Sequence, residues 1–269
     1  MLNLEVRPRQ LKTERTPEQF AEAARTVVAK GYQALKVDPF GAGTYELNRG
    51  EKIRSVALVE AIRDAVGPEV EIFIEGHGRF SATTAIGLAR DLERFDPGWF
   101  EEPIPPEDIP SLAYVRSKIN IPVATGERYF THYEFRQLFE ARAADMIQPD
   151  VTHAGGILEL KKIAAMADAH YLVMAPHNSN GPVCTAASVH FAACTPNFKI
   201  QECFDDFAEP WVKEAVTGAP EVKEGYFDLP VLPGLGIELN EDVIAEHPYH
   251  PGFFNIWQDG WQERQSRQI

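Results

Sequence analysis

The stretch VEIFIEGHGRF, residues 70–80, gives the clearest indication of the fold. It begins as a short apolar run, which is typical of a buried β-strand, and runs directly into glycine. A carboxylate, Glu75, and an imidazole, His77, stand two residues apart near its end. Because alternate side chains of a strand share a face, we expect both to point the same way. The stretch therefore predicts a buried strand with an acid and a base at its tip.

Similar apolar runs recur along the chain, separated by amphipathic segments such as 16–31, 54–67 and 156–170. Strands that alternate with helices in this way predict βα units and a parallel sheet. A weaker strand is predicted in LNLEVRP, residues 2–8. Seven clearer strands are predicted at residues 34–40, 70–76, 98–103, 121–127, 145–150, 171–177 and 198–204.

These elements favour an α/β fold of the modified TIM-barrel type, (β/α)7β, over residues 1–206. A doubly wound open sheet is the alternative, although the chain has no glycine-rich phosphate loop. Residues 207–269 are rich in proline, glycine, tryptophan and acids. We expect them to form an irregular extension, with a short hairpin or helix, that packs on the barrel or on a capping domain.

Composition narrows the possible partners and location. The chain has 269 residues, a net charge of −14 and a pI near 5.0, so nucleic acid and anionic membrane are not expected partners. No apolar stretch approaches the roughly 20 residues of a membrane span, and the first residues lack an apolar signal core. We therefore expect a cytoplasmic protein that binds a small molecule.

An ionisable residue stands at the end of each predicted strand, where barrel enzymes carry their active sites. Three of these residues, Glu75, Glu101 and Glu127, recur once per βα unit. A single glutamate of this kind is more often a solvated loop carboxylate, but three cannot meet in ionised form without a counter-charge. Mg²⁺ favours carboxylate, water and substrate oxygens, so the pattern predicts a magnesium site.

Seven motifs together resemble the enolase superfamily, and within it the mandelate racemase subgroup. The resemblance implies a (β/α)7β barrel with an active-site Mg²⁺. It also implies a reaction that starts with removal of the proton next to a carboxylate and gives a metal-stabilised enediolate. The motifs, in chain order, are LKVDP, IEGHGRF, WFEEP, ATGE, IQPDVTHAGGI, APHNSNGPV and IQECF.

The resemblance assigns Glu75, Glu101 and Glu127 as metal ligands, although the first is more often aspartate in this subgroup. Of the adjacent pair at 101 and 102, the family pattern favours the first. His177 and Asp150 match a histidine–aspartate dyad that removes the α-proton. A histidine is suited to this task because it titrates near neutrality. The remaining alternatives are a buried capping histidine and an aspartate that only caps the next helix.

Glu202 matches the family's acid near the substrate carboxylate. Lys36-x-Asp38 stands where racemases and many dehydratases have Lys-x-Lys, and this disfavours a two-base racemase. We expect Lys36 to neutralise a substrate carboxylate, unless it only pairs with a neighbouring acid. Asp38 and Arg79 are expected to bind substrate.

GHGR resembles galactonate-dehydratase-like members, in which the corresponding histidine, here His77, protonates the leaving hydroxide. The predicted function is dehydration of an aldonate or aldarate to a 2-keto-3-deoxy acid. A sugar-acid cycloisomerase or epimerase and a catalytically silent truncated barrel remain alternatives. Family members usually carry an N-terminal capping domain, and we expect this chain to lack most or all of it. The family habit also suggests a homo-oligomer.

Overall fold

The computed structural model describes residues 2–3 and 15–249, which fall into two compact units. Within these ranges the first unit runs to Thr125 and also includes Glu140–Asp145. The second unit comprises Gly126–Phe139 and the chain from Met146 onward. None of the helices in the described ranges is long and apolar enough to cross a membrane.

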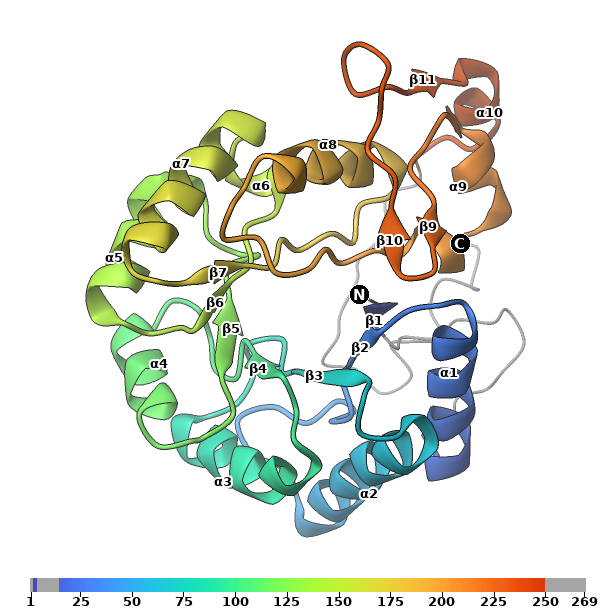
Figure 1. Cartoon of the computed structure of the whole chain (residues 1–269). Coiled ribbons are helices and arrows are strands. Elements are labelled where there is room, and N and C mark those ends of the chain that lie inside the picture. The colour runs from blue at the N-terminus through green and yellow to red at the C-terminus, as the bar shows by residue number, and fades with distance from the viewer. Residues whose placement is uncertain (1, 4–14, 250–269) are drawn as a thin grey trace. The chain divides into compact units, whose positions relative to one another are not determined.

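The first unit is a parallel sheet whose strands follow one another in chain order, each hydrogen-bonded to the next. Its helices line the outer side of these strands (Figure 1). The strands are β1 (Leu2–Asn3), β2 (Ala34–Val37), β3 (Glu71–Glu75), β4 (Trp99–Glu101) and β5 (Val123–Thr125). The helices are α1 (Pro17–Ala29), α2 (Arg49–Val66), α3 (Ala82–Leu92), the 3₁₀ turn η1 (Glu93–Phe95) and α4 (Ile109–Arg116).

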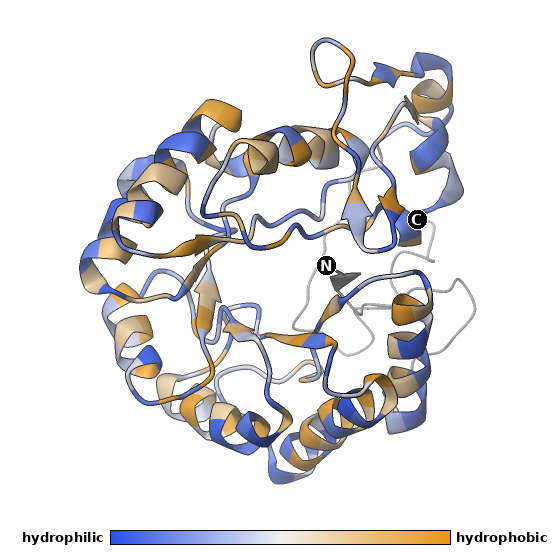
Figure 2. Ribbon diagram, in the orientation of Figure 1, coloured by the Kyte–Doolittle hydropathy of each residue, from blue (hydrophilic) through white to orange (hydrophobic). Residues whose placement is uncertain are grey.

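Apolar strands hold this unit together. All four residues of β2 and the last four of β3 are buried, as expected for parallel strands covered by helices. In Figure 2, β3 and β5 are mainly hydrophobic, whereas the helices mix hydrophilic and hydrophobic residues. Aromatic packing adds to the core, since the rings of Phe73 and Trp99 stack with centroids 3.5 Å apart.

Polar caps decide where the helices of this unit begin. Thr16 and Gln19 form a capping box at α1, and Pro17 occupies the first helical position. Asn48 and Ser81 cap α2 and α3 through their side-chain oxygens. Because α2 starts at its Asn48 cap, it is longer at its N-terminus than the segment predicted from apolar periodicity.

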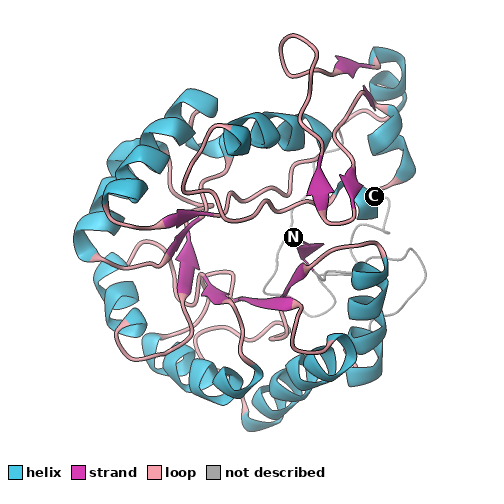
Figure 3. Cartoon of the chain, in the orientation of Figure 1, coloured by secondary structure: helices cyan, strands magenta, loops and turns pink. Residues whose placement is uncertain are grey.

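The second unit contains a short parallel strand pair, β6 (Met146–Ile147) and β7 (Val173–Met174). Its later part consists mostly of loops and two small antiparallel strand pairs (Figure 3). The helices are α5 (Thr131–Ala141, most of which belongs here), α6 (Val151–Ala154), α7 (Ile157–Ala169), α8 (Pro182–Ala193), the 3₁₀ turn η2 (Asp205–Phe207), α9 (Pro210–Glu214) and α10 (Glu241–Glu246). The antiparallel pairs are β8 (Val216–Thr217) with β11 (Glu238–Leu239), and β9 (Val222–Lys223) with β10 (Tyr226–Phe227).

Six of the seven clearer strand predictions are confirmed as β2 to β7, each inside its predicted range. The strand predicted at residues 198–204 is wrong, because only Phe198 forms a parallel bridge, to Met174. Pro176 follows shortly after β7 and has no N–H, so the ladder cannot continue there. Its carbonyl instead accepts a hydrogen bond from the buried side chain of Gln201.

At the N-terminus, the described strand Leu2–Asn3 pairs with β2. The remainder of the eighth predicted strand, 2–8, lies outside the described residues. The domain boundary predicted between residues 206 and 207 stays a prediction.

Candidate active site

Two buried carboxylates end neighbouring strands of the first unit. Glu75 is the last residue of β3 and Glu101 is the last of β4, and the two are register partners in the parallel ladder. Both residues are 0% exposed. Parallel pairing therefore brings together two acids that are 26 positions apart in the chain.

Lys36, in the neighbouring strand β2, supplies a positive charge to this pair. Its Nζ atom lies 2.5 Å from Glu101 Oε1 and 3.2 Å from Glu75 Oε2. The indole of Trp99 donates a hydrogen bond of 3.0 Å to the other oxygen of Glu101. Pairing with neighbouring acids, the alternative considered for Lys36 from the sequence, is thus observed, and its role toward a substrate stays a prediction.

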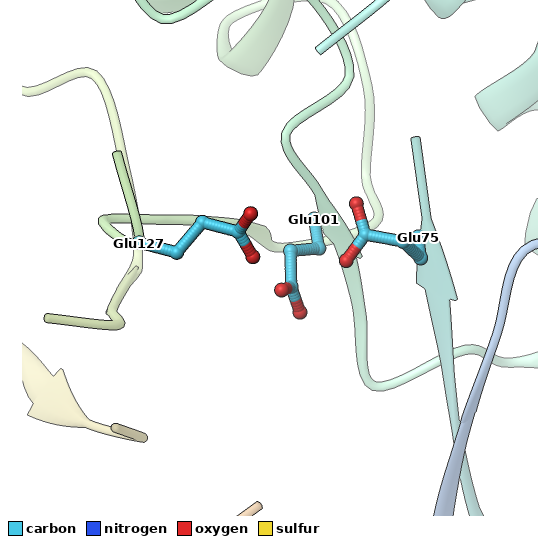
Figure 4. A group of neighbouring side chains, drawn as sticks. All are labelled: Glu75, Glu101 and Glu127. Carbon is cyan, nitrogen blue, oxygen red and sulfur yellow. The ribbon is translucent and has the colours of Figure 1, made fainter. Parts of the chain in front are cut away.

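Glu127 follows β5 by two residues and completes the predicted triad. One oxygen from each of Glu75, Glu101 and Glu127 lies within 4.8 Å of the others, and the three side chains converge (Figure 4). The Oε2 atom of Glu75 is buried and has an ion pair with Lys36 but no hydrogen bond. Three carboxylates with an oxygen of this kind form a donor set that fits Mg²⁺.

His77 lies in a turn beyond β3, so its predicted place on the strand is wrong. The strand ends at Glu75, and His77 has a left-handed backbone with φ of 50°. Its backbone N–H donates to Glu75 Oε1 at 2.6 Å. The flanking Gly76 and Gly78 donate to the carbonyls of Glu101 and Glu102, at 2.9 and 2.7 Å. The turn, and not strand alternation, therefore positions the imidazole.

The imidazole of His77 is paired with a buried aspartate. His77 Nδ1 and Asp38 Oδ2 lie 2.7 Å apart. The other oxygen of Asp38 accepts hydrogen bonds from the Arg79 guanidinium and from the backbone N–H of Phe40. Burial opposes ionisation of Asp38, but the charge of Arg79 and the hydrogen bond with His77 outweigh it and lower its pKa to about 2.

Asp38 and Arg79 are both buried and contact each other. Asp38 also contacts His77, the residue predicted to protonate the leaving group. The Arg79 guanidinium also lies over the rings of Phe40 and Phe80, with its Cζ 6.0 and 5.5 Å from their centroids. The contact of Asp38 and Arg79 with substrate stays a prediction. What the geometry shows is a charged network that holds His77 in place.

The second unit contains a matching pair. His177 Nδ1 lies 2.7 Å from Asp150 Oδ2. Asp150 is also the N-cap of α6, where its other oxygen accepts from the backbone and hydroxyl of Thr152. Burial again raises the pKa of Asp150, but these hydrogen bonds outweigh it and lower that pKa to about 2. Capping and pairing with histidine, which were separate alternatives, are both observed.

Further acids lie near the other ring nitrogen of His177. Its Nε2 atom is 3.3 Å from Glu127 Oε2 and 4.0 Å from Glu202 Oε2. Glu202 is buried and accepts a hydrogen bond of 2.9 Å from the backbone N–H of Asn178. The second unit thus brings His177, Asp150, Glu127 and Glu202 together, and their predicted roles stay predictions.

Sequence reasoning missed Asn180. Its side-chain amide donates to Asp150 Oδ2 at 2.6 Å, the same oxygen that contacts His177. The residue lies in the motif APHNSNGPV, three positions after His177. That proximity was the available signal, but the path of the loop, which returns the amide to Asp150, was not readable from the sequence.

The chain is similar in sequence to one protein family and to several dehydratases. The sequence profile of the family described as enolase C-terminal domain-like matches residues 19–243. A D-gluconate dehydratase of Thermoproteus tenax is 37% identical over 237 residues, which cover 88% of this chain and 48% of that protein. A D-gluconate/D-galactonate dehydratase of Picrophilus torridus is 36% identical, over 87% of this chain and 59% of that protein.

A crystal structure of a mandelate racemase/muconate lactonizing enzyme from Jannaschia sp. CCS1 superimposes with a TM-score of 0.87 at 38% identity. The match covers 94% of this chain and 66% of that one. The chain thus spans about half the length of the curated relatives that it matches.

Proposed function

This chain belongs to the family of enolase C-terminal domain-like proteins, and on that premise we propose that it carries the active site of a Mg²⁺-dependent sugar-acid dehydratase. The reaction converts an aldonate or aldarate to a 2-keto-3-deoxy acid. The names of relatives at 36–37% identity, a D-gluconate dehydratase and a D-gluconate/D-galactonate dehydratase, support this substrate class.

The observation that carries the proposal is the presence of two histidines, each with its Nδ1 atom 2.7 Å from a buried aspartate. A carboxylate at Nδ1 orients the ring and sets the tautomer, so that Nε2 exchanges protons. Dehydration next to a carboxylate needs a base that removes a proton from carbon and an acid that protonates the leaving oxygen. His177 and His77 supply them.

In the proposed reaction, His177 takes the proton from the α-carbon and the electron pair passes into the substrate carboxylate to give an enediolate. His77 then donates a proton to the β-hydroxyl group as the carbon–oxygen bond breaks, and water leaves. The resulting enol gains a proton at the β-carbon to give the keto acid. Proton uptake and release balance across the two imidazoles and solvent.

The remaining residues stabilise charge or orient the bases. A Mg²⁺ ion held by Glu75, Glu101 and Glu127 would stabilise the negative charge that develops on the substrate carboxylate. Asp38 and Asp150 hold the two imidazoles, as their hydrogen bonds support. Glu202, near Nε2 of His177, would lie near the substrate carboxylate.

The test is a screen of the purified chain with Mg²⁺ against gluconate, galactonate, xylonate and a set of aldarates. Products are trapped with semicarbazide, and exchange of the α-proton is followed by NMR in D₂O. The variants are His177→Asn and His77→Asn, with His170→Asn, an exposed histidine at the end of α7, as the matched control.

We expect wild type and His170→Asn to form product. His177→Asn should lose both product and α-proton exchange, whereas His77→Asn should lose product but keep exchange. Exchange or epimer formation without product in the wild type would favour the epimerase alternative. No exchange and no product with any acid would refute the proposal for this chain.

A further inference from the structure

The ammonium group of Lys36 lies between two of the three carboxylates of the proposed magnesium site. It is 2.5 Å from Glu101 and 3.2 Å from Glu75, and the lysine is only 1% exposed. We propose that Lys36 sets the cation affinity of this site: its fixed positive charge keeps Mg²⁺ binding weak and exchangeable and lets the chain fold without the ion. The inference rests on the magnesium site of the proposed function.

Burial makes this charge influential. Lysines are almost never fully buried unless they are paired, and Lys36 pairs with Glu75 and Glu101, which are themselves fully buried. In a poorly solvated interior a unit charge a few ångströms from a cation site acts far more strongly than it would in water. A divalent cation bound by the same carboxylates would therefore be repelled by the ammonium group.

Two further contacts fix the carboxylates independently of the lysine. Trp99 donates to Glu101 Oε2, and the backbone N–H of His77 donates to Glu75 Oε1. Removal of the ammonium group is therefore expected to change the charge of the site more than the orientation of its ligands. This is why substitution of Lys36 reports on electrostatics and not on loss of the binding geometry.

Opposite effects on stability and on affinity follow from this arrangement. Without the ammonium group, two fully buried carboxylates lose their ion-pair partner, and a buried charge that has lost its partner strongly destabilises the fold. A divalent cation would then neutralise the two carboxylates in place of the ammonium group, so folding would become coupled to metal binding. The same substitution should lower the stability of the metal-free protein and raise its affinity for Mg²⁺.

The experiment compares wild type, Lys36→Met and Lys52→Met by thermal unfolding in EDTA and across a Mg²⁺ titration, with calorimetry for the dissociation constant. Lys52, paired with Asp91 at 2.6 Å in a partly exposed position, is the matched control. Glu101→Gln removes a metal ligand, so the rise in melting temperature that Mg²⁺ causes in wild type should be absent from this variant.

We expect Lys36→Met to melt at a lower temperature than wild type in EDTA, to show a larger rise in Tm with Mg²⁺, and to bind the ion at least about tenfold more tightly. Lys52→Met should match wild type in all three. If Lys36→Met folds only with Mg²⁺ present, that result supports the inference. If it does not fold at all, Lys36→Gln, which keeps polarity but no charge, is measured in its place.

Equal or weaker Mg²⁺ binding by the uncharged variant, with a normal response in wild type, overturns the role of Lys36 and leaves the proposed function intact. No Mg²⁺ response in either protein overturns both the magnesium site and this inference. Because the readouts are melting temperature and binding heat, a chain inactive toward every sugar acid still gives a decisive answer.

Discussion

Replacement of Asp38 by asparagine is expected to lower the free energy of unfolding by about 2 to 5 kcal/mol at pH 7. The substitution keeps the shape of the side chain and removes its charge. In the native protein that charge faces the buried Arg79 guanidinium and the ring of His77. The change therefore leaves a buried cation without its counter-charge.

The lower end of the range comes from the pKa of Asp38, which falls from 3.8 to about 2 on folding. A difference of one pKa unit corresponds to about 1.4 kcal/mol, so preferential stabilisation of the ionised form amounts to about 2 kcal/mol. The upper end is the total loss that is typical when one partner of a buried ion pair is removed, about 3–5 kcal/mol.

The measurement is urea unfolding followed by circular dichroism, for wild type, Asp38→Asn and Asp91→Asn. Asp91 pairs with Lys52 in a partly exposed position, where such pairs contribute about 1 kcal/mol or less. A loss for Asp38→Asn no greater than that of this control would refute the reasoning.

The pH dependence gives a second check. Because folding lowers the pKa of Asp38, its contribution is fully present above the unfolded value of 3.8 and is lost as pH falls through the folded value of about 2. The part of the difference between wild type and Asp38→Asn that comes from ionised Asp38 should therefore shrink as the pH falls from about pH 4 to pH 2. A difference that does not shrink would contradict the assignment of the stabilisation to ionised Asp38.

Three other results are expected. Gly126→Ala should destabilise by about 1–3 kcal/mol in thermal unfolding, because the new Cβ would lie 2.7 Å from the backbone of Gln148; an unchanged Tm would contradict this. Asp150→Ala should cost at least about 1 kcal/mol through loss of the α6 cap, and more through loss of the His177 contact, as measured by the urea midpoint; wild-type stability would show that neither matters. EDTA should lower the Tm of protein prepared with Mg²⁺, and the loss should reverse on adding excess ion; no change would argue against the carboxylate triad as a metal site.

The apolar pattern was enough to predict the strands that form the core. Strands β2 to β7 all fall inside predicted runs, because strands buried by covering helices are continuously hydrophobic. The run at residues 198–204 looked similar but is not a strand, since pairing depends on its neighbour, and the neighbour is interrupted by Pro176. The residues of the run alone therefore do not show whether the neighbouring strand can pair with it.

Site residues were predictable as a set, but their mutual contacts were not. The position of Glu75 and Glu101 at neighbouring strand ends follows from βα periodicity. The ion pair between Lys36 and Glu101 spans 65 positions and depends on sheet register and side-chain length. For His77, the two flanking glycines signalled a turn, and strand alternation was extended two residues too far.

That turn has a consequence for how new chemistry could arise at this site. It is held by backbone hydrogen bonds of residues 76–78, including the one from His77 N–H to Glu75, and none of these uses the imidazole. The side chain at position 77 can thus be exchanged while the backbone contact with Glu75 is kept, and the side-chain contact that such an exchange removes is the one with Asp38. The left-handed backbone restricts the exchange, because asparagine, aspartate and glycine adopt it readily and β-branched residues do not. Redesign of the reaction from this position is therefore a choice among few residues, made without rebuilding the turn that carries it.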